Sequence, residues 1–211
     1  MNQVIDPMEA EPLDAIVVDD GPSPIVLVAT WIVVGLLIVL ALWWAWTRVI
    51  NPSGGSVVDK FVDGESGQLY ESLRDQFRVE LPTKPQRREQ PGPLGPVAIV
   101  DSRPGPDYLF AVIREPQPAD ALENYEPILD TAAGSLANQV GGEIVKQSPP
   151  IPIPINGQAI KDVVFRKGEQ YYRNRLILAN GRLYTLQVMV EGDSEDEFTA
   201  MAKTFKVLGP R

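Results

Sequence analysis

The sequence YYRNRLILANGRLYTLQVMV, residues 171–190, decides the fold. Residues 171–178 and 182–190 are strand-like runs, rich in aromatic and large apolar side chains. Asn180 and Gly181 stand between the two runs, and both residue types tolerate the positive φ angles of a two-residue hairpin turn. The stretch therefore predicts a long antiparallel hairpin.

A helix is predicted before this hairpin. Apolar side chains in residues 125–140 recur at spacings of three, four and seven, which places them on one helical face. Pro127 suits the first turn of such a helix, and Gly141 with Gly142 supplies its C-terminal end. We expect this face to pack against the sheet.

A short C-terminal helix is predicted after the hairpin. Ser194 and Glu197 have the spacing of a capping box, in which each side chain bonds the other's backbone N–H. The apolar repeat of residues 198–205 then has helical spacing. Residues 204–208 can alternatively begin a last strand.

Further strands are predicted on both sides of the long helix. Residues 77–81 alternate apolar and charged side chains, and Pro82 ends the run. Residues 82–96 hold five prolines and predict an exposed basic loop, and residues 69–73 predict a short helix or turn. The other strand-like runs are residues 97–100, 108–113 and 143–147. Strands segregated from a few helices imply an α+β domain, with a twisted antiparallel sheet flanked by helices.

A membrane span is predicted near the N-terminus. Residues 24–48 read PIVLVATWIVVGLLIVLALWWAWTR and contain no charged side chain before Arg48. About 22 helical residues match a hydrocarbon core of about 30 Å. A cleaved signal peptide would be shorter and preceded by basic residues, and a helix buried in a soluble protein would be apolar on one stripe only. The predicted membrane anchor consists of Trp43, Trp44, Trp46 and Arg48.

The orientation of this span follows from its basic flanks. No Lys or Arg precedes the span, whereas Arg48 and Lys60 follow it. Positively charged flanks stay on the cytoplasmic side, which favours a cytoplasmic C-terminal domain. Long domains can be translocated against this rule, so the extracytoplasmic orientation stays open.

The chain divides into four predicted segments. Residues 1–23 form an acidic tail, residues 24–48 the transmembrane helix, residues 49–68 a linker, and residues 69–211 the folded domain. The formal net charge of the whole chain is −9, and the acidic tail accounts for most of it. The nearly neutral remainder lacks the concentrated basic surface that nucleic-acid binding needs.

Most catalytic and metal chemistries are excluded by composition. The chain has no Cys and no His, which removes thiolate nucleophiles, the commonest metal ligand and the commonest general base. No phosphate-binding, dinucleotide-binding or nucleophile-elbow motif occurs. The acidic run at residues 193–197 lacks the ligand spacing of an EF-hand loop and suits a helix N-terminus. We therefore expect no catalytic residues, no cofactor and no metal.

Two groups of residues are candidate partner contacts. Arg173 and Arg175 lie on one face of the hairpin's first strand, opposite Tyr172, and should face solvent or a partner. Residues 149–155 hold four prolines and predict an extended segment or a sheet edge. The isoleucines of that segment, which can form a docking strip or pack back on their own domain, are Ile151, Ile153 and Ile155.

Residues 70–208 resemble the PsbP-like α+β superfamily. The resemblance is carried by FRVELPTKP (77–85), LDTAAGSLANQVGGEI (129–144), IKDVVFRKGEQYYRNRLILANGRLYTLQV (160–188) and EFTAMAKTFKVL (197–208). It implies a twisted antiparallel sheet flanked by helices. Members of the superfamily include accessory proteins of a photosynthetic reaction-centre complex, assembly or stabilising factors, and a soluble binder of a small GTPase, generally without catalytic residues.

Together these features predict a single-pass accessory or stabilising subunit of a larger membrane complex, photosynthetic or respiratory. Its partners would be other subunits of that complex and the lipid bilayer. One alternative is a free-standing, membrane-tethered domain that binds a small ligand or peptide in the sheet concavity. Another is a tethered hydrolase that uses carboxylates.

Overall fold

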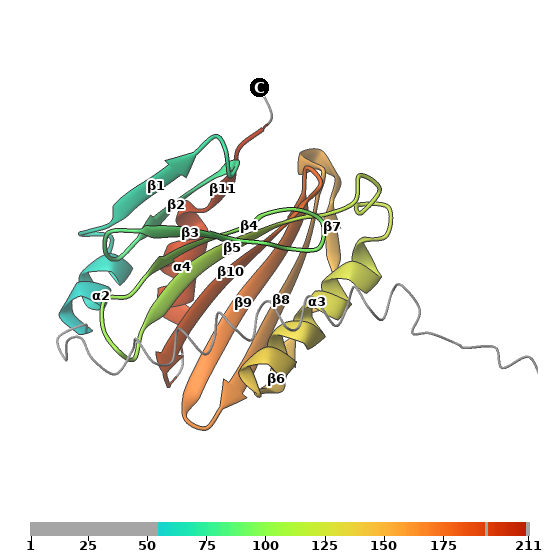
Figure 1. Cartoon of the computed structure of the whole chain (residues 1–211). Helices are drawn as coiled ribbons and strands as arrows, with labels where there is room; N and C mark the ends of the chain where they lie inside the picture. Colours follow the sequence, from blue (N-terminus) through green and yellow to red (C-terminus); the bar gives the residue numbers. More distant parts are fainter. Residues whose placement is uncertain (1–54, 193, 210–211) are drawn as a thin grey trace, which may run out of the picture.

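The computed structural model describes residues 55–192 and 194–209 (Figure 1). The predicted acidic tail and membrane span lie outside these residues, and so do the four predicted anchor residues, Trp43, Trp44, Trp46 and Arg48. Within the described ranges, no helix combines the length and the apolar composition needed to cross a bilayer. The span therefore stays a prediction from the sequence.

Two antiparallel sheets form the framework (Figure 1). The large sheet has eight strands, and the eighth, β7 (Ile151–Ile153), pairs with β8 beside β6. The other seven lie in the spatial order β3 (Gln86–Gln90), β4 (Val97–Ser102), β5 (Leu109–Pro116), β10 (Arg182–Glu191), β9 (Gln170–Ala179), β8 (Gln158–Lys167) and β6 (Glu143–Gln147). The small sheet contains β1 (Gln68–Ser72), β2 (Phe77–Leu81) and β11 (Lys206–Val207). The predicted α+β class with an antiparallel sheet is confirmed.

Helices cover both faces of the large sheet. Helix α3 (Tyr125–Val140) lies on one face, in front of the sheet in Figure 1, where it packs on β8 and β9. Helices α2 (Gly55–Val62) and α4 (Glu195–Thr204) lie on the other face. A short 3-10 helix, η1 (Pro154–Asn156), follows β7. The result is a three-layer arrangement with an apolar core on each side of the sheet.

The predicted hairpin is the centre of the sheet. Strands β9 and β10 pair from Ala179 with Arg182 to Gln170 with Glu191. The two turn residues, Asn180 and Gly181, have φ angles of 52° and 64°, as a type I′ turn requires. Because successive side chains alternate, one set of hairpin residues enters the core under α3 and the other enters the core under α4.

The long helix also forms where periodicity predicts it. Its apolar face is buried, including Leu129 at 0% and Leu136 at 8% exposure. Gly141 ends it in the left-handed region, with φ of 63°, and its N–H bonds the carbonyl of Asn138. The helix therefore has the predicted face and the predicted end.

Three predictions near the start of the domain are wrong. Residues 55–62 of the predicted linker form helix α2, because Val58 and Phe61 are 2% and 4% exposed in the core. The predicted helix or turn at residues 69–73 is mostly strand β1, whose partner is β2. The predicted loop at residues 82–96 contains edge strand β3. The folded domain thus begins before residue 69.

Two features near the C-terminal half also differ from the sequence prediction. No strand was expected at residues 158–167, yet β8 pairs with β9 along its whole length. Ser194 occupies the N-cap position of α4, but its hydroxyl is buried and makes no cap hydrogen bond, so the predicted capping box is not formed. The last strand, β11, is only two residues long, and α4 extends to Thr204.

Two glycine substitutions should change the free energy of unfolding in opposite directions. Gly181→Ala should lower the free energy of unfolding by about 1 kcal/mol, because an L residue is strained in the left-handed region. A Cβ there would meet only a carbonyl oxygen at 3.8 Å, so the cost is conformational. Gly134→Ala, inside α3 with open space around it, should raise the free energy of unfolding by about 1 kcal/mol. Urea unfolding measures both, and the same sign for the two variants would contradict the account.

Candidate interaction surface

The structure brings the predicted partner contacts onto one face of the sheet. In the register, Ile151 of β7 pairs with Ile160 of β8, which pairs with Ile177 of β9. Ile177 belongs to the core on the α4 side, so Ile151 also lies on that side. Arg175, two residues from Ile177, points to the same side. Four predicted contacts, Arg173, Arg175, Ile151 and Ile153, therefore lie on the α4 side of β7 and β9, whereas Ile155 lies beyond β7 in η1.

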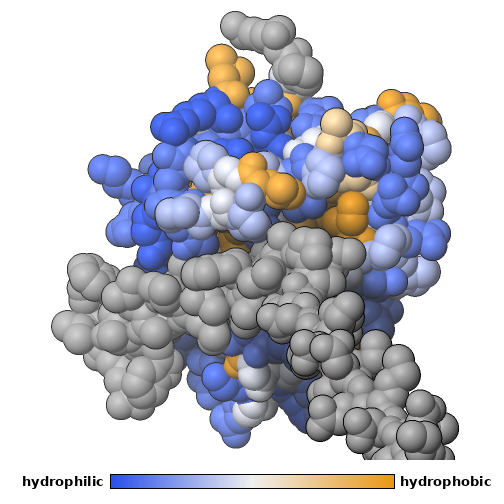
Figure 2. All heavy atoms as spheres, turned by 45° about the vertical axis from the view of Figure 1, so that its right-hand side comes forward, coloured by the Kyte–Doolittle hydropathy of each residue, from blue (hydrophilic) through white to orange (hydrophobic). Residues whose placement is uncertain are grey.

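Exposed apolar side chains gather along the sheet edge beside this face, although Ile144 itself lies on the α3 side, since it pairs with Phe165. Seven large hydrophobic side chains are exposed in the described part of the chain, and four of them lie along the edge that β6, β7 and η1 form. We call these four residues the edge strip: Ile144, Val145, Ile151 and Ile155. Ile155 is 97% exposed and Ile151 is 53% exposed, whereas Ile153 is half-buried. On the face that Figure 2 shows, hydrophobic side chains reach the visible surface in separate patches among hydrophilic ones.

The edge strip cannot take up another strand along its whole length. Proline has no N–H, and Pro152 sits within β7 with Pro150 and Pro154 on its two sides. Prolines on an edge strand blunt pairing with a further chain. Contacts at β7 must therefore be made by side chains, which suits an apolar docking contact better than strand addition.

The two predicted arginines are bound within their own chain. Arg175 makes a bidentate ion pair with Asp162, with N···O distances of 2.7 and 2.9 Å, and this hydrogen bonding raises the pKa of the guanidinium. Its guanidinium also lies 5.7 Å from the ring centroid of Phe198 in α4. Arg173 contacts Glu195 at 3.2 Å, and its side chain is only 15% exposed. Both arginines were expected to face solvent or a partner. Their side chains are 15% and 33% exposed, and each pairs with a carboxylate of its own chain, so contact with a partner stays a prediction.

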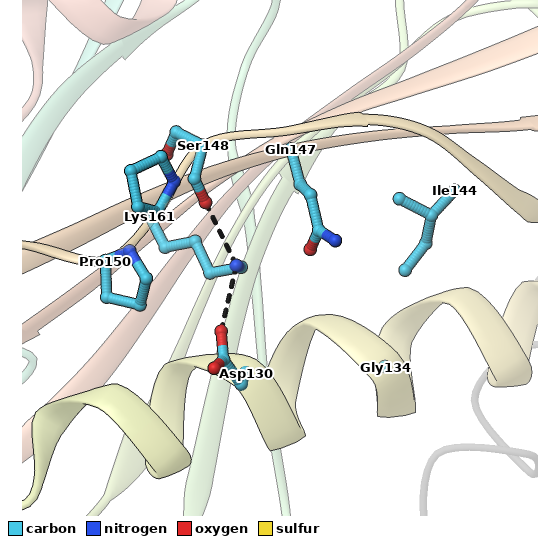
Figure 3. A pocket seen from close by; sticks show the side chains of 8 residues that line it. Asp130, Gly134, Ile144, Gln147, Ser148, Pro150 and Lys161 are labelled. Carbon is cyan, nitrogen blue, oxygen red and sulfur yellow. Dashed lines mark hydrogen bonds and ion pairs between the residues drawn. The ribbon is translucent and has the colours of Figure 1, made fainter.

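A buried lysine ties the chain that precedes β7 to α3 (Figure 3). The Lys161 ammonium donates to the Ser148 carbonyl at 3.0 Å and lies 2.9 Å from a carboxylate oxygen of Asp130 in α3. Ser148 is held further by its N–H on the Asp162 carbonyl and by its hydroxyl, which accepts from the Asp162 N–H. These contacts form the floor of a groove of about 520 Å³ between α3 and β6. The chain between β6 and β7 is therefore tied to β8.

Sequence reasoning missed a buried ionic cluster at the other end of the sheet. Asp75 is fully buried in the turn between β1 and β2, and Arg87 of β3 binds it through two bonds of 2.7 and 2.9 Å. The Tyr70 hydroxyl donates to the same carboxylate at 2.6 Å, and Arg114 lies 3.6 Å from it. The cluster joins the small sheet to the large one. The only sequence signal was the cluster of basic residues in what was expected to be a loop.

The basic and hydrogen-bonding neighbours of Asp75 keep its carboxylate ionised at neutral pH. Burial alone would raise the pKa of Asp75, but hydrogen bonds from Arg87 and Tyr70 lower it to about 2. Among the described residues, no group of three or more acidic side chains is placed to hold a metal ion. The polar clusters found here thus join secondary-structure elements.

Comparison with solved structures shows which known fold this one resembles. No protein-family model matches the sequence, and no curated protein matches it either. The structure is similar to the solution structure of cyanobacterial PsbP (CyanoP) from Synechocystis sp. PCC 6803, with a TM-score of 0.52. The two sequences are 16% identical over 67% of this chain and 92% of that chain. The fold is PsbP-like.

A second solved structure is less similar to this PsbP-like domain. It is a crystal structure from Bacteroides thetaiotaomicron VPI-5482, which has a TM-score of 0.38 and 12% identity over 68% of this chain and 49% of that chain. The likeness to the cyanobacterial PsbP structure confirms, at the level of the fold, the resemblance that the sequence indicated. The partner-binding role of the arginines and isoleucines stays a prediction.

Acid should weaken the Asp75 cluster. A carboxyl whose pKa is lowered from 3.8 to about 2 stabilises the fold above pH 4, and this stabilisation, about 2 kcal/mol, is lost as the pH falls toward 2. Asp75→Asn should remove it at neutral pH and flatten the dependence between pH 4 and 2. Urea unfolding measures the effect, with exposed Asp63→Asn as the control. Equal acid dependence in Asp75→Asn and in the native chain would contradict the assignment.

Proposed function

We propose that this chain is a membrane-anchored, non-enzymatic accessory subunit that binds another subunit of a larger membrane complex through the outer edge of its PsbP-like domain. The observation that carries the proposal is the edge strip. Four exposed aliphatic side chains along one sheet edge are a concentration of apolar surface that an isolated domain would not need.

The rigidity of this edge supports a binding role. Lys161 fixes the approach to β7, and the Arg175–Asp162 pair lies beside the apolar residues. An interface with an apolar centre and a polar rim is the usual anatomy of a protein contact. Because the edge is held in place before binding, little conformational entropy is lost on contact.

The likeness to a cyanobacterial PsbP favours a photosynthetic complex over a respiratory one. The assignment to a membrane complex depends on the predicted span at residues 24–48 together with the edge strip. With a cytoplasmic domain, as the basic residues after the span favour, the partner surface would lie on that side of the bilayer.

Charge substitutions at the edge strip test the proposal. In the full chain, Ile151→Asp with Ile155→Asp should reduce co-purification of the partner subunit from native membranes at least tenfold. A carboxylate that is desolvated without a partner opposes association strongly. Since both side chains are exposed, the free energy of unfolding should change by no more than about 0.5 kcal/mol.

The matched control carries the same charges elsewhere. Leu69 and Leu73 are 61% and 57% exposed near the small sheet, away from the edge strip. The double variant Leu69→Asp with Leu73→Asp should co-purify the partner as the native chain does. Undiminished co-purification of the edge variant, or equal loss in both variants, would overturn the proposal.

A second candidate function is ligand binding by a free-standing, membrane-tethered domain. It is favoured by one observation, a partly enclosed groove beside α3 that is lined by both apolar and polar side chains. This groove lies on the opposite face of the sheet from Ile151 and Arg175.

A further inference from the structure

Strand β6 is an open end of the large sheet. It has one neighbouring strand, β8, in the described part of the chain, and all five of its residues are exposed. Its sequence, EIVKQ, contains no proline, in contrast to β7. No described residue forms a hydrogen bond with the backbone groups on the outer side of β6. Such groups are a template for one further strand.

Charge and local geometry limit which strand can pair there. The register of β6 on β8 shifts between Ile144 and Lys146, which is a β-bulge. Glu143 pairs with Arg166 of β8. Lys146 pairs with Val164, two residues away, so Glu143 and Lys146 both lie on the α4 side of the sheet. Neither side chain forms an ion pair with another described residue.

We propose that β6 pairs antiparallel with β6 of a second copy of this chain, across a two-fold axis perpendicular to the sheet. In this register Glu143 lies opposite Lys146 of the second copy, and Ile144 lies opposite Val145. Each pair occurs twice, because the same patch of both copies makes the contact. Opposite charges and aliphatic pairs across two strands both stabilise a sheet. The two large sheets then form one continuous sheet.

The order of charges along β6 selects a second copy over an unrelated strand. A bulge and a charged residue on an edge strand oppose pairing in general. An acid and a base that share one side of the strand are complementary to the same sequence read in the opposite direction. A shift of one residue would bring Ile144 opposite Lys146, whose side chains lie on opposite sides of the sheet. The register is therefore specified as well as the partner.

The predicted membrane span is compatible with this symmetry. Two spans in one bilayer require the two-fold axis to stand perpendicular to the membrane, so the α4 side of both sheets faces the same way. Helix α2, the first described element after the predicted span, lies on that side. The paired stretch is short, but anchoring both copies in one bilayer raises their effective concentration. We therefore expect the dimer in membranes.

This inference goes beyond the proposed function, which concerns a different subunit. Self-pairing uses the backbone edge of β6 with Ile144 and Val145, whereas the test of the proposed function changes Ile151 and Ile155. Liposomes that contain only this chain report self-association, and co-purification from native membranes reports the other subunit. Failure of one result therefore leaves the other intact.

Energy transfer between fluorescent copies of the full chain in phosphatidylcholine liposomes tests the pairing. The chain has no cysteine, so Glu169→Cys, in the exposed turn between β8 and β9, carries the dye in every variant. We expect transfer between donor-labelled and acceptor-labelled chains, and a decrease when unlabelled chain is added in excess. Transfer no greater than that of randomly distributed chains at the same surface density would overturn the proposal.

Charge reversals assign the association to β6. Glu143→Lys and Lys146→Glu should each lower the association constant about tenfold, because like charges then face each other twice in the dimer. Donor-labelled Glu143→Lys mixed with acceptor-labelled Lys146→Glu should associate as the native chain does, because opposite charges again face each other at both positions. Both side chains are exposed, so the variants should fold normally.

The matched controls reverse exposed charges away from β6. Glu123→Lys and Lys84→Glu change the net charge by the same amounts and should associate like the native chain. Three results would contradict the assignment to β6: native-like transfer in each single β6 variant, no recovery in their mixture, or an equal loss in the control variants.

Discussion

Burial of the central hairpin on both faces is the constraint on which the rest of the structure depends. Strands β9 and β10 lie in the middle of the large sheet, and neither face of β10 is left open: Tyr184 and Leu186 enter one core while Leu183 and Met189 enter the other. A side chain of this size contributes roughly 1.5–3 kcal/mol when it is fully buried. The pattern requires helices on both sides, which α3 supplies on one face and α2 with α4 on the other. The two-residue turn at Asn180 and Gly181 fixes the register, and a slip of one residue would exchange the two cores.

Local signals predicted the parts of the fold that local chemistry determines. The Asn-Gly turn and the helical repeat of residues 125–140 were sufficient because turn geometry and one buried face follow from a few neighbouring residues. Helix α2 was missed because Gly54, Gly55 and Ser56 suggest a linker, whereas distant contacts of Val58 and Phe61 determine the helix. Strand β3 was missed because prolines flank it, which an edge strand tolerates. Strand β8 was missed because Lys161 and Asp162 interrupt its apolar alternation.

The candidate sites, like the fold, depend partly on local sequence and partly on tertiary contacts that the sequence does not show. The sequence indicated Ile151 and Arg175 as separate candidate contacts. Only the strand register places both on one face, and no local signal gives that register. The ion pair of Arg173 with Glu195 could not be predicted, because the position of α4 is a tertiary contact. The sequence carried a signal for the groove beside α3 at Glu115, because the alternation of β5 places this side chain on the α3 side of the sheet. Gln139 is similarly a polar residue on the buried side of α3, and only the structure reveals that its oxygen is unpaired.

The strongest polar contacts and most of the exposed apolar side chains lie in different parts of this PsbP-like domain. Its strongest polar contacts, the Asp75 cluster and the Lys161 contacts, join elements of the fold, whereas its exposed apolar side chains are concentrated at the β6–β7 edge. Extraction of the full chain from native membranes in mild detergent, followed by sizing and mass spectrometry, tests the accessory-subunit account most directly. The account predicts that the chain migrates in an assembly much larger than itself, with the same large subunits present at fixed stoichiometry. Migration as a detergent-bound monomer without other subunits would contradict it.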